Sequence, residues 1–159
     1  MSNPNRRLAA VLMEHRTIDN PWVSGVWRPI AVIEDDIEVA TPPRLVESKD
    51  GRELWLHTGL VVEIFRDEAD GYYLNLTTEQ PFAFVEWELT ESGPETRWIT
   101  LSYDEAARRI DGGAQVEGVP MPSDWLPWLA AFTEEHFVPL KKKERVRPKS
   151  FKGARRDDA

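Results

Sequence analysis

The first hundred residues alternate between short apolar runs and polar turns rich in Gly, Pro, Asp and Asn. Residues 8–18 and 26–34 form the first two runs, and residues 53–65 form a third. Short β-type runs joined by short turns favour antiparallel pairing, whereas parallel strands need a crossover helix between them. The pattern therefore predicts antiparallel strands in this part of the chain.

Two of these strands are expected to be irregular. Pro29 has no N–H group for a ladder hydrogen bond, so residues 26–34 should be an edge strand or contain a bulge. In residues 53–65 the apolar positions change parity at Gly59. Because a shift of one residue exchanges the two faces of a strand, this change predicts a bulge at Gly59 or two strands that meet there.

Three further strands are predicted, over residues 72–76, 82–89 and 96–101. Apolar and polar residues alternate in the second of them, which is typical of a strand with one face on the core. The inward-facing residues of this strand would be Ala83, Val85, Trp87 and Leu89. A polar turn at residues 67–71 precedes the first of these strands, and another at residues 91–94 separates the second from the third.

Helical patterns are confined to the C-terminal part of the chain. Ser102 and Glu105 match a capping box, and Gly112 and Gly113 are suited to end the helix that it begins. Residues 114–122 are interpreted as a loop. A second helix follows, with an amphipathic stripe at spacings of three and four formed by Trp125, Trp128, Leu129, Phe132 and His136.

These elements predict an α+β fold. It would contain a mostly antiparallel β sheet of about six strands, arranged as a sandwich or partial barrel, and two C-terminal helices. A chain of 159 residues is one domain by length.

Charge divides the chain into two parts. Residues 1–139 contain 11 basic and 25 acidic residues, a net charge of −14, whereas residues 140–159 contain nine basic and three acidic residues, a net charge of +6. The C-terminal part is too poor in apolar residues to fold alone. We therefore expect a single α+β domain over residues 1–139 and a disordered basic tail over residues 140–159. The acidic domain argues against nucleic acid as the partner.

The sequence contains no recognisable catalytic or metal-binding motif. It has no Cys, which excludes disulfides, thiolate metal sites and Cys nucleophiles. It also lacks a Walker A loop, a G-x-G-x-x-G loop and a G-x-S-x-G elbow. The three His, at positions 15, 57 and 136, have no metal-ligand spacing, and the acidic residues 34–38 fit a solvated turn better than a cation site. No catalytic residue is assigned, and the cofactor is unknown.

No apolar stretch approaches the roughly 20 residues that span a bilayer, so we expect a cytoplasmic protein.

Partner binding is the remaining kind of site. Tryptophans could line a binding surface, or they could pack in the core or fix loops; the candidates are Trp22, Trp27, Trp125 and Trp128. Basic residues of the tail could attract an acidic partner or an anionic surface, or could only solubilise the acidic domain. These candidates are Lys141, Lys142, Lys143 and Arg145.

Three stretches of the chain together resemble one uncharacterised family of small bacterial proteins. They are NPWVSGVWRPIAVI, GYYLNLTTEQPFAFVEWEL, and the C-terminal block from LSYDEAARRIDGG to KKKERVRPKSF. The family is a domain of unknown function. Its genes are found beside those of formate dehydrogenase, and its members are sometimes labelled molybdopterin-guanine dinucleotide biosynthesis protein A. The resemblance therefore implies a connection to molybdoenzyme assembly, and it supplies no catalytic residues.

Two hypotheses follow from the residues and the resemblance. The first is a non-catalytic accessory or adaptor protein for maturation of a molybdenum-dependent formate dehydrogenase, with a molybdoenzyme subunit or an assembly factor as its partner. The alternative is an enzyme or binding protein for a molybdopterin nucleotide cofactor. The alternative needs a pocket lined by basic side chains of the folded domain, such as Arg28, Arg97, Arg108 and Arg109.

Overall fold

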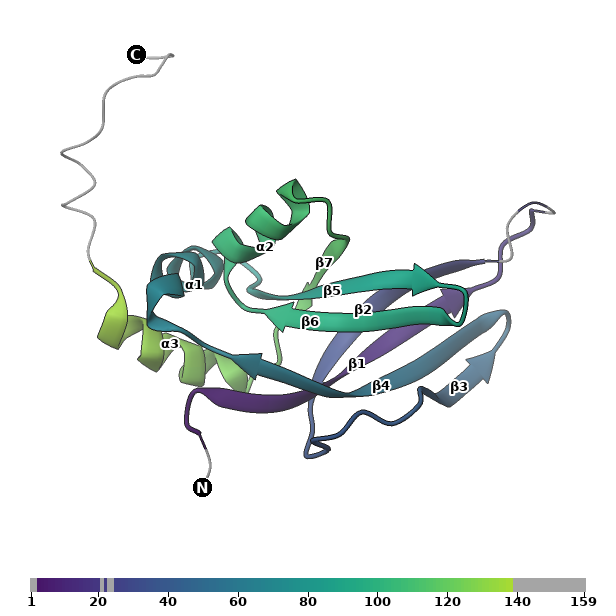
Figure 1. Cartoon of the computed structure of the whole chain (residues 1–159), viewed down its shortest axis with the longest axis horizontal. Coiled ribbons are helices and arrows are strands. Elements are labelled where there is room, and N and C mark those ends of the chain that lie inside the picture. The colour runs from purple at the N-terminus through teal and green to yellow at the C-terminus, as the bar shows by residue number, and fades with distance from the viewer. Residues whose placement is uncertain (1–2, 21, 23–24, 139–159) are drawn as a thin grey trace, which may run out of the picture.

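A computed structural model describes residues 3–20, 22 and 25–138 of the chain, which form two antiparallel sheets and three α-helices (Figure 1). The elements are β1 (Arg6–Arg16), β2 (Val26–Glu34), β3 (Arg44–Lys49), β4 (Arg52–Glu63), the 3₁₀ turn η1 (Arg66–Glu68), α1 (Ala69–Leu76), β5 (Phe82–Thr90), β6 (Gly93–Thr100), α2 (Tyr103–Asp111), β7 (Val116–Pro120) and α3 (Trp125–His136). The strand order is β2-β1-β4-β3 in one sheet and β6-β5-β7 in the other. The predicted α+β class is confirmed.

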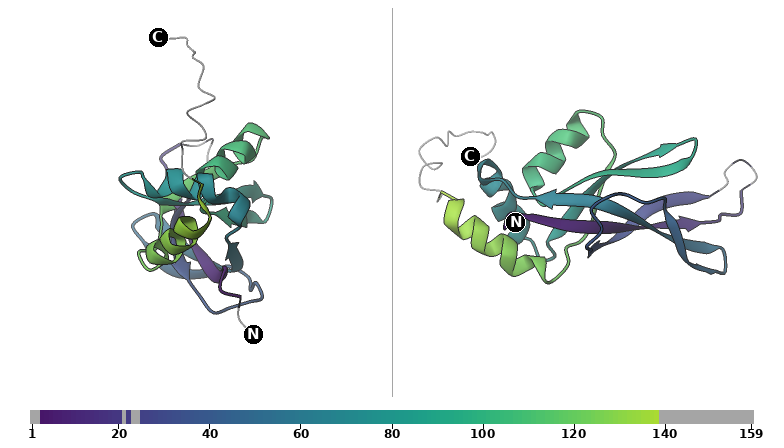
Figure 2. Two further views of the ribbon diagram at one scale, coloured as in Figure 1. Left: turned by 90° about the vertical axis from the view of Figure 1, so that its left-hand side faces the viewer. Right: turned by 60° about the horizontal axis from the view of Figure 1, so that its bottom comes forward.

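The two sheets share one hydrophobic core with helices α1 and α3. Each central strand supplies completely buried side chains, such as Val11 and Met13 from β1 and Val85 from β5. Helix α3 adds Trp125 and Leu129 to the same core. Helices α1 and α3 gather at one end of the sheets, whereas the β3–β4 and β5–β6 turns lie at the opposite end (Figures 1 and 2). The molecule therefore has a helical end and a hairpin end.

Both irregular strands behave as the sequence indicates. β2 is an edge strand, and its register with β1 shifts at Leu12 and Met13, which pair with Ala31 and Pro29. The register of β1 with β4 shifts opposite Gly59, whose φ of 81° lies in the left-handed region. These shifts confirm the edge position of Pro29 and the bulge at Gly59.

Residues 72–76 are helical, so the prediction of a strand there is wrong. The alternation of Tyr72, Leu74 and Leu76 suggested a strand, but the buried side chains are Tyr72 and Asn75, three residues apart on one helix face. The Tyr72 hydroxyl accepts a hydrogen bond from the Phe65 N–H at 2.8 Å. The amide of Asn75 donates to the Leu101 carbonyl at 2.8 Å. Contacts of these two side chains outside the segment therefore favour the helix over the local β preference.

Three other sequence predictions also need correction. Residues 114–122 are not only a loop, because β7 lies within them and pairs with β5. Strand β3 was not predicted; all its residues are exposed, so it has no buried face that would produce alternation. Leu89 is exposed near the hairpin end rather than buried.

Candidate functional site

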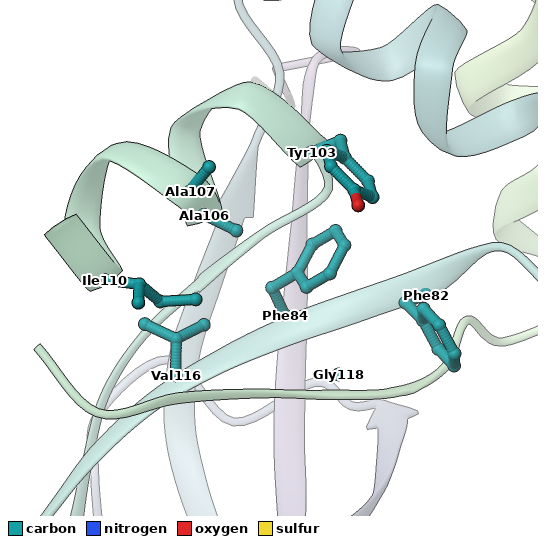
Figure 3. A pocket seen from close by; sticks show the side chains of 8 residues that line it. All are labelled: Phe82, Phe84, Tyr103, Ala106, Ala107, Ile110, Val116 and Gly118. Carbon is teal, nitrogen blue, oxygen red and sulfur yellow. The ribbon is translucent and has the colours of Figure 1, made fainter.

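An apolar groove of about 330 Å³ lies between α2 and the outward face of β5 and β7 (Figure 3). Its lining consists of Phe82, Phe84, Tyr103, Ala106, Ala107, Ile110, Val116 and Gly118. The strand period explains this position, because Ala83 and Val85 face the core and their neighbours Phe82 and Phe84 must face outward. The Tyr103 hydroxyl is the one polar side-chain group in this lining.

Aromatic side chains of the groove hold one another at its base. The Phe84 and Tyr103 rings meet edge to face with centroids 6.0 Å apart, and the Phe82 and Phe84 rings are 6.1 Å apart. On β7, Gly118 has no side chain, and a Cβ there would lie 3.1 Å from the Phe82 ring. Tyr103 and Ile110 remain 48% and 51% exposed. An apolar surface that stays open in this way marks a candidate binding site.

A hydrogen-bonded cap fixes the start of α2, the helical wall of the groove. The Ser102 hydroxyl accepts from the Glu105 N–H at 3.0 Å and donates to Glu68 at 2.7 Å. The Glu105 carboxylate accepts from the Thr100 hydroxyl, and the Ser102 N–H also donates to that hydroxyl. The predicted Ser102 cap is confirmed, whereas the reciprocal half of the capping box is replaced by Thr100.

Two arginines attach the rest of α2 to the body. Arg108 pairs with Glu68 at 2.6 Å, and Arg109 pairs with Glu86 of β5 at 2.7 Å. The guanidinium of Arg109 also lies 3.2 Å from the centre of the Trp98 ring, a cation–π contact. The Ser102 cap therefore holds the beginning of α2, and these two arginines hold its C-terminal half.

Gly71 of α1 allows the start of α2 to approach closely, and Gly71→Ala is expected to lower the free energy of unfolding by about 1–3 kcal/mol, the usual cost of overpacking. An added Cβ would clash with the Ser102 hydroxyl and displace the cap. Chemical denaturation followed by circular dichroism measures the effect. Gly112→Ala is the matched control, because a Cβ there has only ordinary contacts at 3.6 Å. Equal stability of the two variants would contradict this packing.

A second hollow, of about 240 Å³, lies where the β5–β6 turn approaches the inner face of the first sheet. Its lining consists of Trp27, Pro43, Trp55, His57, Ser92, Gly93 and Pro94. Trp55 and His57 point to the same face of β4 because they are two residues apart. Their partners on β1, Met13 and Val11, are completely buried, so this face is the inward one.

The structure separates the four candidate tryptophans. Trp22 is 88% exposed, and Trp27 lines the second hollow. Trp125 is completely buried in the core, where its indole N–H donates to Glu34 at 2.9 Å. Trp128 is half-buried and donates to the Pro4 carbonyl at 2.8 Å. Trp125 and Trp128 contact each other on α3 with ring centres 6.0 Å apart, whereas Trp27 lies on β2.

The predicted tail, residues 140–159, and its candidates Lys141, Lys142, Lys143 and Arg145 lie outside the described residues.

The arginines named for a cofactor pocket do not line either hollow. Arg97 pairs with Glu88 and Glu95, and Arg28 is exposed on β2. Arg108 and Arg109 are engaged by their carboxylate partners beside the groove. A pocket for a molybdopterin nucleotide therefore stays a prediction of the sequence.

The three histidines lie on different elements, His15 on β1, His57 on β4 and His136 on α3. His15 contacts the Trp27 ring and His136 contacts the Phe132 ring, each with centroids 4.5 Å apart. Burial lowers the pKa of His57. Within the described residues, no group of three or more His, Asp or Glu is placed to hold a metal ion. None of the helices in that part of the chain has the length and apolar character of a membrane span.

The fold and its two hollows define a small α+β protein made of two antiparallel sheets and a helical end. A family model described as "Protein of unknown function (DUF3305)" matches residues 8–147, and the chain belongs to this family. The match bears out the resemblance to an uncharacterised family. No curated protein and no solved structure matches the chain.

Proposed function

We propose that the protein is a non-catalytic accessory or adaptor, acting in the cytoplasm, that holds an apolar segment of a partner protein in the groove beneath α2. The observation that carries this proposal is the lining of the groove. It offers half-buried aromatic and aliphatic side chains and a single hydroxyl group, with no ionisable pair for acid–base chemistry. Such a surface supports recognition of an apolar side chain rather than a reaction.

The geometry of the groove suits insertion of one anchor residue. Anchor residues contribute most of the energy at protein interfaces when they fill well-packed pockets. The Phe84 and Tyr103 rings are already fixed against each other, so little side-chain freedom is lost on binding. The folded domain carries a net charge of −14, which favours a partner with basic residues flanking the anchor.

The partner we propose is a subunit or assembly factor of a molybdenum-dependent formate dehydrogenase. The support for this identity is the resemblance of the chain to a family whose genes accompany those of formate dehydrogenase. The groove supplies the contact surface, and the acidic domain supplies electrostatic attraction.

An affinity pull-down with wild-type protein and two variants tests this function. Ala107→Arg places a long charged side chain at the exposed rim of the groove, and Ala130→Arg makes the same change on the exposed surface of α3. We expect wild type and Ala130→Arg to recover the partner, and Ala107→Arg to recover at least about tenfold less, since every 1.4 kcal/mol is tenfold in affinity. Unchanged recovery with Ala107→Arg would exclude the groove. Failure of the wild type to recover any dehydrogenase component, with normal formate oxidation in a deletion strain, would overturn the proposed function.

A further inference from the structure

The imidazole of His57 lines the hollow at the hairpin end. His57 is only 6% exposed, and no described residue forms a hydrogen bond with its side chain. Burial lowers the pKa of the His57 imidazole below its usual value, so the ring is neutral at pH 7 and offers one donor and one acceptor. Among the described residues, the only fully enclosed side-chain atom without a hydrogen bond is Asp35 Oδ2, so the unpaired His57 nitrogens still reach the open space of the hollow. They can therefore pair with the polar edge of a bound molecule.

Two indoles beside His57 are held in place before anything binds. The ring of His15 contacts the Trp27 ring with centroids 4.5 Å apart. The Trp55 indole N–H donates to the Glu53 carboxylate at 3.0 Å. Side chains fixed in this way lose little freedom when they stack on a planar ligand.

The size and charge of the hollow limit the ligand. Its volume of about 240 Å³ is below the roughly 300–1,000 Å³ of sites for drug-sized molecules, so it holds one small ring system. No Lys or Arg is among its lining residues. The lining itself therefore offers no cation to neutralise a phosphate. A proline-rich segment would need an extended track, whereas this is a single depression bordered on one side by residues 92–94 of the β5–β6 turn.

We propose that this hollow is a binding site for an uncharged heteroaromatic ring of purine size, stacked against Trp27 and Trp55 and hydrogen-bonded to His57. This inference is independent of the groove beneath α2, because the two hollows share no residue. The protein would then carry a small-molecule site at the hairpin end in addition to a proposed partner site beside α2.

The test uses the full chain with adenine, hypoxanthine and their nucleosides, measured by saturation-transfer NMR and calorimetry. Ser92→Phe fills the hollow from the exposed turn, and Glu91→Phe adds the same ring at the next position, which does not line it. Wild type and Glu91→Phe should bind, and Ser92→Phe should bind at least about tenfold more weakly. His57→Phe keeps a ring and removes the polar atoms, so it should weaken binding by about tenfold, the effect of one hydrogen bond.

Three outcomes would overturn the inference. One is the absence of saturation transfer and heat with every ring compound in the wild type. Another is equal binding by wild type and Ser92→Phe. The third is much tighter binding of the nucleoside monophosphates than of the nucleosides, because the site would then recognise phosphate. Ala107→Arg should leave ring binding unchanged, so failure of the partner site and failure of this site can be told apart.

Discussion

Trp125→Ala is expected to lower the free energy of unfolding by about 3–5 kcal/mol, the range for truncating a fully buried aromatic side chain. The indole of Trp125 is completely buried, contacts Trp128, and donates its N–H to Glu34 at the end of β2. In the variant the Glu34 carboxylate still accepts a hydrogen bond from Arg7 at 3.1 Å. Most of the lost stability therefore comes from the cavity that the indole leaves. Urea unfolding followed by far-ultraviolet circular dichroism measures the change.

The other tryptophans provide matched comparisons. Trp128→Ala should cost less than Trp125→Ala, because Trp128 is half-buried and its truncation leaves a smaller cavity. Loss of the contact with Arg7, whose guanidinium lies 4.5 Å from the ring centre, adds only part of the difference back. Trp22→Ala should change stability by less than about 0.5 kcal/mol, as exposed substitutions usually do. If Trp125→Ala were no more destabilising than Trp22→Ala, this would contradict the packing of α3 on the sheets through the Trp125 side chain.

Elements that depend on local rules could be predicted from the sequence. The bounds of β2, the Ser102 cap and the bulge at Gly59 each follow from the chemistry of one or two residues. α1 and β7 could not be predicted in this way. Their conformations depend on partners that are distant in sequence, such as β5 for β7 and Leu101 for Asn75.

In the candidate sites too, single residues could be predicted from the sequence, whereas their neighbours from other elements could not. Trp27 could be named because an aromatic residue close to a Ser-Gly pair is conspicuous in the sequence. Its neighbours Trp55 and Pro94 come from other strands, and only the register of the sheets brings them together. In the groove, Phe82 and Phe84 occupy the polar parity of an alternating strand, and this is the feature that could have marked them as unusual. Recognising a groove there requires knowing that α2 crosses the outward face of β5.

The basis of the last prediction is the buried amide of Asn75, which joins α1 to both walls of the groove. Its side-chain NH₂ donates to the Phe82 and Leu101 carbonyls, each at 2.8 Å. Its side-chain oxygen accepts from the Phe82 N–H at 2.9 Å. Phe82 begins β5 and lines the groove, while Leu101 directly precedes the cap of α2. One side chain therefore fixes the spacing between the strand wall and the helix wall.

Asn75→Leu is expected to lower the free energy of unfolding by about 3–5 kcal/mol, because three backbone groups lose their partners and each buried unsatisfied group costs about 1–3 kcal/mol, partly offset by the apolar leucine. The two side chains are similar in size, so the variant tests the polar contacts and not a cavity. Urea unfolding gives the magnitude, and Gln80→Leu is the control, since that exposed amide only bonds its neighbour Pro81. If the two variants were equally stable, the amide of Asn75 would not hold the groove walls together. If instead Asn75→Leu is destabilised as expected, it should also lose partner recovery under conditions where Gln80→Leu retains it, because Phe82 and α2 would no longer be held at a fixed distance.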